Sequence, residues 1–291
     1  MQTRGQKIFR VINGIVLILL TLCCLLPFLN LLAISFSSST AVVTEKIRFV
    51  PKQFTFLSYK FVLEKPEFYR SFMISLLKVA VGVPVNMLLT IMVAFPLSRS
   101  SKEFRGRNFY MWFFIITMVF SGGLIPWYMI INKLGLIDSF WALILPVAVP
   151  VYNIVLLTNA FKSVPRELEE AAIIDGASNV SVMIRICVPL VKATIASLVL
   201  FCLVSHWNSW FEGLILMNSP KHYPLQSYLQ TVMVNRDVTL MTTNNLQYLN
   251  MVSERTSRAA QVFIATLPVL GVYPFLMKYF ITGELAGAVK G

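Results

Sequence analysis

The sequence predicts an all-α membrane protein with six transmembrane helices. Hydrophobic residues make up 57% of the 291 residues and charged residues only 13%, whereas a soluble domain is usually about 25% charged. Six intervals carry no charge at all, and each is close to the roughly 20 residues that a helix needs to cross the hydrocarbon of a bilayer. We therefore expect a single transmembrane domain over residues 1–291, without a large soluble domain.

The charge-free intervals are the predicted spans. They cover residues 11–44, 79–98, 108–132, 139–161, 193–211 and 259–277. Each should be a helix, because a backbone in lipid must satisfy its own hydrogen bonds. Arg4, Lys7 and Arg10 precede the first interval as in a signal peptide. No clear small-residue cleavage site follows them, so we expect an uncleaved first helix.

The distribution of basic residues predicts the orientation. Six spans place both termini on one side of the membrane. The short connection after the second span carries Arg99, Lys102, Arg105 and Arg107, which favours a cytoplasmic position for it and for both termini. Outer loops are then expected over residues 35–70 and 218–258, although the first of these is also basic. The net charge of +12 lies in loops, so it favours anionic lipid headgroups over nucleic acid as the partner.

Small residues interrupt the third interval. Gly122, Gly123 and Pro126 stand near its expected outer end. Glycine and proline allow close helix packing and a local break in a membrane helix. This pattern predicts either a packing kink or a gate.

Polar residues interrupt the fifth interval. Ser205 and Asn208 lie in it and Glu212 directly follows it. The three have the spacing i, i+3, i+7 of one helical face, and Trp210 lies among them. A carboxylate within the membrane should face protein or water, and polar groups beside aromatic rings suit sugars. Together with Lys78 of the second span, these residues are candidates for a substrate path. Alternatively, Glu212 and the tryptophan lie at the outer interface and Lys78 extends toward the headgroups.

The chain carries no pattern typical of an enzyme. Its four cysteines and two histidines, His206 and His222, have no metal-binding spacing. The sequence contains no GxxxxGK[ST] phosphate loop and no constellation of nucleophile and base. We therefore expect no catalytic residues, no metal and no directly bound cofactor.

Residues 162–190 have the pattern of helix, turn, helix. Apolar residues between Leu168 and Ile174 predict a short amphipathic helix, Asp175 and Gly176 form a turn pair, and helical spacing resumes around Val180. A protruding helix of this kind can fill a groove on another protein. The alternative is an amphipathic helix that lies in the membrane interface.

This stretch resembles the EAA loop of binding-protein-dependent ABC importers. In that motif Glu-Ala-Ala is followed after two residues by Asp-Gly-Ala, and then by a hydrophobic helix that ends at Pro-Leu. The matching residues are Glu170, Ala171, Ala172, Asp175, Gly176, Ala177, Pro189 and Leu190. The sequence departs from the motif at Ala193, where many relatives have a second proline.

Further motifs extend the resemblance to nearly the whole chain. SGGLIPWY at 121–128, Trp207-Asn208, YPLQ at 223–226 and GAVKG at 287–291 look like the MalG-type carbohydrate permeases, and within them the LplC/YtcP branch. That branch is associated with oligosaccharides and polysaccharide fragments. The resemblance implies the type I ABC importer permease fold, a place in the bacterial cell membrane and transport by alternating access.

The same resemblance implies an assembly. It consists of a second related permease in a heterodimer, two ATPase subunits that hold ATP and Mg²⁺, and an extracellular solute-binding lipoprotein that delivers the oligosaccharide. In the family the EAA loop sits in a cleft on the ATPase. That role is implied here for Glu170, Ala171, Ala172, Asp175, Gly176 and Ala177. The tail at 289–291 is a second expected ATPase contact.

Two other kinds of transporter stay open at this point. One is an ABC permease for a different solute, such as amino acids, polyamines or phosphate. The other is a secondary transporter driven by protons or sodium, although we find no convincing internal repeat of the kind such transporters commonly show. A receptor or scaffold would lack ATP-dependent uptake altogether.

Overall fold

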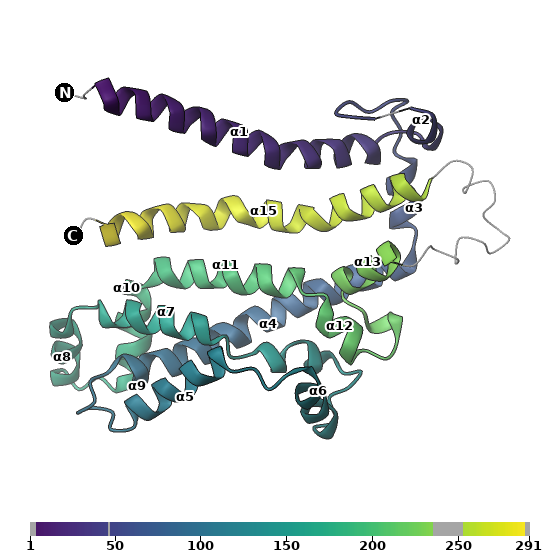
Figure 1. Cartoon of the computed structure of the whole chain (residues 1–291). Helices are drawn as coiled ribbons and strands as arrows, with labels where there is room; N and C mark the ends of the chain where they lie inside the picture. The colour runs from purple at the N-terminus through teal and green to yellow at the C-terminus, as the bar shows by residue number, and fades with distance from the viewer. Residues whose placement is uncertain (1–3, 46, 235–252, 289–291) are drawn as a thin grey trace. The chain divides into compact units, whose positions relative to one another are not determined.

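The computed structural model describes residues 4–45, 47–234 and 253–288, which are mainly helical (Figure 1). Among these residues there is no β-strand, and one isolated β-bridge joins Ser37 to Phe54. The prediction of an all-α chain is therefore confirmed. The chain divides into two compact units. The first consists of Met1–Tyr69 with Leu229–Leu267, and the second of Arg70–Tyr228 with Pro268–Gly291.

The first unit begins with one long helix and continues with short ones. Its elements are α1 (Arg4–Ser35), α2 (Ser39–Thr44), α3 (Leu57–Leu63), the start of α4, the end of α13 and the first part of α15 (Glu254–Ala288). The predicted outer loop at 35–70 is largely folded. Phe36 stacks on Phe54 with ring centroids 5.3 Å apart, and on Tyr59 at 4.7 Å. Burial raises the pKa of Tyr59, and this effect outweighs the hydrogen bond with Ser35, which lowers the pKa.

The second unit contains most of the helices. They are α4 (Pro66–Ser98), α5 (Arg107–Val119), α6 (Leu124–Lys133), η1 (Phe140–Leu143), η2 (Leu145–Val147), α7 (Val151–Lys162), α8 (Arg166–Ile174), α9 (Asn179–Val182), η3 (Met183–Cys187), α10 (Val188–Leu190), α11 (Lys192–Asn208), α12 (Phe211–Leu216), η4 (Pro220–His222) and α13 (Leu225–Val234).

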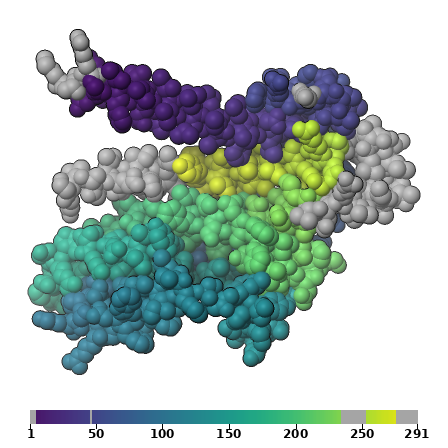
Figure 2. Space-filling model, viewed as in Figure 1, coloured from purple at the N-terminus to yellow at the C-terminus, as the bar shows by residue number. Residues whose placement is uncertain are grey.

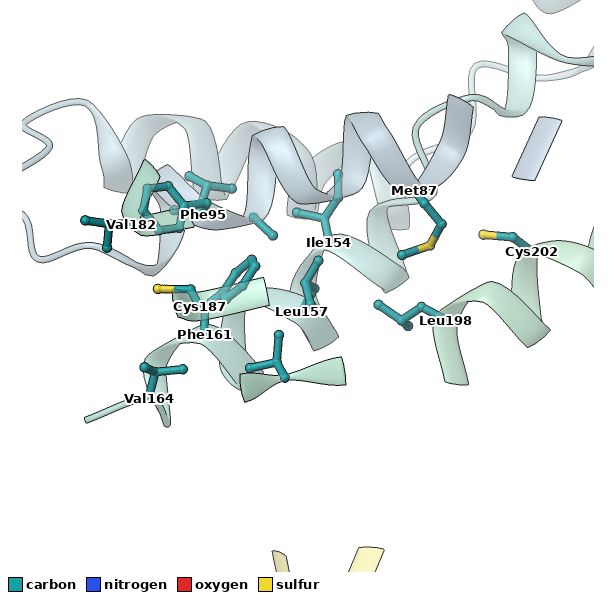
Figure 3. Packing of buried hydrophobic residues seen from close by; sticks show 13 residues of the cluster. Met87, Phe95, Ile154, Leu157, Phe161, Val164, Val182, Cys187, Leu198 and Cys202 are labelled. Atoms are coloured by element: carbon teal, nitrogen blue, oxygen red, sulfur yellow. The ribbon is translucent and has the colours of Figure 1, made fainter. Parts of the chain in front are cut away.

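An apolar core joins these helices. Figure 3 shows side chains of α4, α7 and α11 meeting in its centre, with Val182 and Cys187 at one end. The labelled residues are Met87, Phe95, Ile154, Leu157, Phe161, Val164, Val182, Cys187, Leu198 and Cys202. Because lipid is as apolar as these side chains, close packing rather than exclusion of water holds such a core together within a membrane.

Two helices are long and apolar enough to cross a membrane, Gly5–Ser35 with 31 residues and Pro66–Ser98 with 33. Three bent pairs also qualify. They are Arg107–Val119 with Leu124–Lys133 at 116°, Phe140–Val147 with Val151–Lys162 at 49°, and Asn179–Leu190 with Lys192–Asn208 at 85°. If each bent pair is one span, the part of the chain that the structure describes contains five spans.

Two predicted spans are not single helices. In the third interval α5 ends at Val119 and α6 begins at Leu124, since Gly123 between them has φ 89°, a value that side chains other than glycine rarely allow. In the fifth interval α11 ends at Asn208 and α12 begins at Phe211, with Ser209 extended at φ −70° and ψ 128°.

Helix α12, after the break in the fifth interval, is closely packed. A Cβ atom at Gly213 would lie 2.7 Å from Cδ of Pro224, so α12 packs closely on the start of α13. The prediction that Ser205, Asn208 and Glu212 share one helical face is therefore wrong, because Glu212 belongs to a different helix.

Two predicted features fall outside the described residues in whole or in part. The outer loop expected at 218–258 is described only up to residue 234 and again from residue 253. The tail at 289–291 also lies outside the described residues.

Candidate functional site

The predicted helix, turn and helix are present at one end of the second unit (Figure 1). The amide of Gly176 donates to the carbonyl of Ile173 at 3.0 Å, and the amide of Ala177 donates to that of Ala172 at 2.9 Å. These two bonds are the Schellman pattern, which needs a residue in the left-handed conformation. Gly176 has φ 87°. Glycine therefore allows α8 to end sharply at this point.

The chain restarts as a helix directly after this turn. The hydroxyl of Ser178 accepts a hydrogen bond from the amide of Ser181 at 3.3 Å and so caps α9. A wider π-helical turn follows over Met183–Cys187. Such π turns occur often at functional sites.

The surface of α8 is the reverse of that of an ordinary amphipathic helix. Leu168 is 48% exposed, Ile173 51% and Ile174 85%. The residue that α8 buries is Glu169, at 5% exposure. In Figure 2 the teal spheres of α7 and α8 form part of the surface of the second unit. α8 therefore presents apolar side chains outward, as a helix that docks into a groove does.

The predicted coupling residues fall into two groups. Glu170, Ala171, Asp175 and Gly176 are exposed. Ala172 and Ala177 are half-buried and pack against the apolar core. The first group is thus available to another protein, while the second attaches the turn to the rest of the unit.

A buried ion pair lies beneath α8. The guanidinium group of Arg99, the residue after α4, pairs with the carboxylate of Glu169. The Arg99 guanidinium also lies over the ring of Phe95, 4.1 Å from its centroid. Oε1 of Glu169 accepts from Sγ of Cys187 at 3.5 Å. Three parts of the chain, α4, α8 and η3, thus meet at Glu169.

An exposed ion pair lies next to the buried one. Arg166 at the start of α8 is 2.7 Å from Glu103, which follows α4. Burial alone would raise the pKa of Glu103. The amide of Ser100 and the Arg166 guanidinium outweigh that effect and hold this pKa below its usual value. Both ion pairs line a pocket of about 670 Å³ between the end of α4, α8 and α9.

A second polar cluster lies between α4 and α11. The amine of Lys78 is buried and donates to the hydroxyl of Ser209. Glu212 is close enough to act on Lys78 electrostatically, and its buried Oε2 accepts no hydrogen bond from the described residues. The His206 ring lies 3.3 Å from Oδ1 of Asn86. The structure therefore brings Lys78 and Glu212, two of the predicted path residues, into one cluster.

The other predicted path and gate residues lie elsewhere. Ser205, Asn208 and Trp210 are exposed. The three gate candidates, Gly122, Gly123 and Pro126, are also exposed, at the sharp bend between α5 and α6.

Sequence reasoning missed four members of these clusters. They are Arg99 as a partner of α8, Glu169, His206 and Asn86. Glu169 stands beside the motif residue Glu170, but a pair of adjacent glutamates does not indicate which one is buried. His206 and Asn86 lie 120 positions apart, and no sequence spacing indicates that they meet. Polar residues inside apolar intervals are the one signal that could have drawn attention to both.

Comparison with known proteins agrees with these features. Residues 3–283 match the family model of the binding-protein-dependent transport system inner membrane component. Protein LplC of Bacillus subtilis is 40% identical, over 99% of this chain and 97% of its own length. The polygalacturonan/rhamnogalacturonan transport system permease protein YtcP of the same organism is 34% identical, over 94% and 96%.

A solved structure is also similar. It comes from a bacterial ABC transporter involved in the import of the acidic polysaccharide alginate, with 30% identity, a TM-score of 0.87 and coverage of 96% of this chain and 99% of that one. The resemblance to the LplC/YtcP branch is confirmed. Membership of an ABC importer family leaves the ion-driven alternative without support. The chain belongs to the binding-protein-dependent transport system inner membrane components and is a membrane permease of an ABC importer.

Proposed function

We propose that the chain is a six-span permease that imports oligosaccharides or polysaccharide fragments across the bacterial cell membrane. The observation that carries this proposal is the α8–α9 loop, whose exposed apolar residues and glycine turn fit the EAA loop of ATP-driven importers. An exposed apolar surface of this kind, rimmed by charged residues, is typical of a protein contact. The ATPase is the partner of α8 in this proposal.

The proposed assembly has two related permeases. The α8–α9 loop and both termini face the cytoplasm, where two ATPase subunits bind ATP and Mg²⁺. Glu170, Ala171, Ala172, Asp175, Gly176 and Ala177 occupy the cleft of one ATPase. A solute-binding lipoprotein docks on the other side of the membrane. The permease itself binds no cofactor and catalyses no reaction.

The substrate class rests on the relatives. YtcP is described as a polygalacturonan/rhamnogalacturonan permease, and the similar structure belongs to an importer of the acidic polysaccharide alginate. We therefore propose an oligosaccharide, with acidic ones to be tested first. Lys78 and Glu212 mark the substrate path, because Glu212 keeps a buried oxygen free to accept a hydrogen bond from a sugar hydroxyl.

Transport then follows alternating access. Closure of the ATPase dimer on ATP moves the coupling loops and turns the two permeases from an outward-facing to an inward-facing state. The bend at Gly122, Gly123 and Pro126 is the proposed gate, since a residue with positive φ can absorb backbone rotation where an unbroken helix cannot.

Purification of the tagged chain from its native membrane tests the assembly. We expect a second permease, an ATPase and a solute-binding protein in the purified complex, identified by mass spectrometry. The complex is then placed in liposomes with the binding protein and labelled galacturonate oligomers. Uptake that requires internal ATP supports the proposal. Recovery of the chain alone in mild detergent, or uptake driven by an ion gradient without ATP, would overturn it.

A further inference from the structure

The ion pair between Arg99 and Glu169 has an unusual position for a surface helix. The Arg99 side chain is 18% exposed and that of Glu169 only 7%. Burial removes water from both charges, so each depends on the other for its stabilisation. The ring of Phe95 below Arg99 and the thiol of Cys187 beside Glu169 enclose the pair further. The link between α4 and α8 therefore resists separation more than an exposed ion pair would.

α8 has few other attachments to α4. Of its large apolar side chains, Leu168 and Ile174 are exposed, and Ile173 lines the pocket beside α4. The pocket of about 670 Å³ separates much of α8 and α9 from the last turns of α4. Across this space the connections are the buried pair of Arg99 with Glu169 and the exposed pair of Glu103 with Arg166. A displacement of α8 can therefore reach α4 through the buried ion pair, besides Ala172 and Ala177, which pack against the apolar core.

α4 connects the ion pair to the polar cluster deeper in the unit. Arg99 directly follows the last residue of α4, and Lys78 lies on the same helix. The two residues are 21 positions apart, which is about 30 Å along a helix. Pro84 and Pro96 lie within α4 between them, but α4 is one helix from Pro66 to Ser98, and a rigid helix can carry a movement over such a distance. The side chain of Lys78 contacts Ser209, next to the break between α11 and α12.

We propose that the buried pair of Arg99 and Glu169 is the joint that transmits movement of α8 to α4 and so couples ATP hydrolysis to transport. This inference rests on the proposed function, in that it takes the ATPase as the partner of α8. Both residues are positioning residues, since they act through the helices that they connect. The exposed pair of Glu103 and Arg166 contributes little to transmission, because water screens it and leaves both side chains free to rotate.

The test uses the complete complex in liposomes. Two rates are measured, namely ATP hydrolysis stimulated by the binding protein and uptake of labelled galacturonate oligomers. The variants are Glu169→Gln and Arg99→Gln, with Arg99→Lys as the conservative change. Glu103→Gln and Arg166→Gln are the matched controls, because they remove a charge from the neighbouring exposed pair.

We expect the two variants of the buried pair to lower uptake about tenfold at unchanged recovery of the complex. ATP hydrolysis should continue, so that more ATP is consumed for each sugar imported. Arg99→Lys should restore much of the lost uptake, since it keeps the positive charge. The uptake rates of the two control variants should stay within about threefold of the wild-type rate. A purely structural role would change the amount of complex and leave the ATP consumed per sugar unaltered.

Two results would overturn the proposed role of the Arg99–Glu169 pair. One is normal uptake and normal stimulation in Glu169→Gln. The other arises if the single variants fail to assemble and the apolar double variant, Arg99→Met with Glu169→Leu, restores both assembly and coupled uptake, because the pair would then serve stability alone. If the wild-type complex hydrolyses ATP on stimulation but imports no galacturonate oligomer, the proposed substrate fails. The role of the Arg99–Glu169 pair is then tested by comparing the stimulated rate of ATP hydrolysis between the variants and the wild type.

Discussion

The short helices at the two ends of the second unit, α12 and α8, bury opposite kinds of residue. At the α12 end, Leu216 and Leu225 are fully buried, while Asp138 and His222 pair at the surface. At the α8 end the charged Glu169 is buried and Ile174 is 85% exposed. The two ends lie at opposite sides of the same unit in Figure 1.

This difference fits the proposed docking of α8 on the ATPase. A helix that is stabilised by its own unit buries apolar side chains, as α12 does with Leu216. Helix α8 instead exposes Leu168, Ile173 and Ile174, and an exposed apolar surface of this kind is typical of a contact with a protein or a membrane. Its buried charges are acceptable because they pair with each other.

Removal of an apolar side chain at each end tests this contrast most strongly. Leu216→Ala should lower the free energy of unfolding by about 2–5 kcal/mol, because it leaves a cavity in a packed site. Ile174→Ala should leave the stability of the isolated chain nearly unchanged and weaken its association with the ATPase. Thermal unfolding of the purified chain and recovery of the ATPase with it measure the two effects. Equal destabilisation by both changes would contradict the contrast.

The glycine turn after α8 provides a second test of whether the α8 end docks on a partner. Gly176→Val should strain the backbone by about 1–2 kcal/mol, because valine does not tolerate φ 87°. The permease should still insert into the membrane, while the yield of complex with the ATPase falls. Gly176→Asn should retain more of that yield, since asparagine adopts the left-handed conformation more readily.

Gly14→Val is the control for this experiment. Gly14 lies in α1 with open space around its Cα and without positive φ, so the same added side chain meets no obstacle. Equal complex yields for the two valine variants would remove the argument that the turn of α8 is needed for docking.

The surface pair at the α12 end should give the smallest effect. Nδ1 of His222 lies 2.8 Å from Oδ1 of Asp138, and this hydrogen bond holds the pKa of Asp138 below its usual value. The stabilisation is present above the unfolded pKa, about 4, and disappears as the pH falls through the lowered folded value. Asp138→Asn should therefore slightly lower the unfolding temperature at neutral pH and have no effect in strong acid. The measurement is the unfolding temperature of the variant and the wild type at several pH values. A difference between the two that grows in acid would contradict this assignment.

Much of the α8–α9 loop could be predicted from the sequence. Asp175 and Gly176 form a turn through local backbone preferences, and the residues on either side have helical spacing. The fifth interval shows the limit of such reasoning. It carries no charged residue, but α11 ends at Asn208 and α12 begins at Phe211, so Ser205, Asn208 and Glu212 do not share one helical face.

The sequence by itself determined the membrane-spanning, all-α character of the chain, its family and the turn at Gly176. These depend on composition and on interactions between near neighbours. Only the tertiary structure decided that Arg99 pairs with Glu169, 70 positions away, and that Lys78 meets Ser209, 131 positions away. The energy of a buried charge depends on which group the fold places beside it. That choice is made by the packing of α4 against α8 and α11.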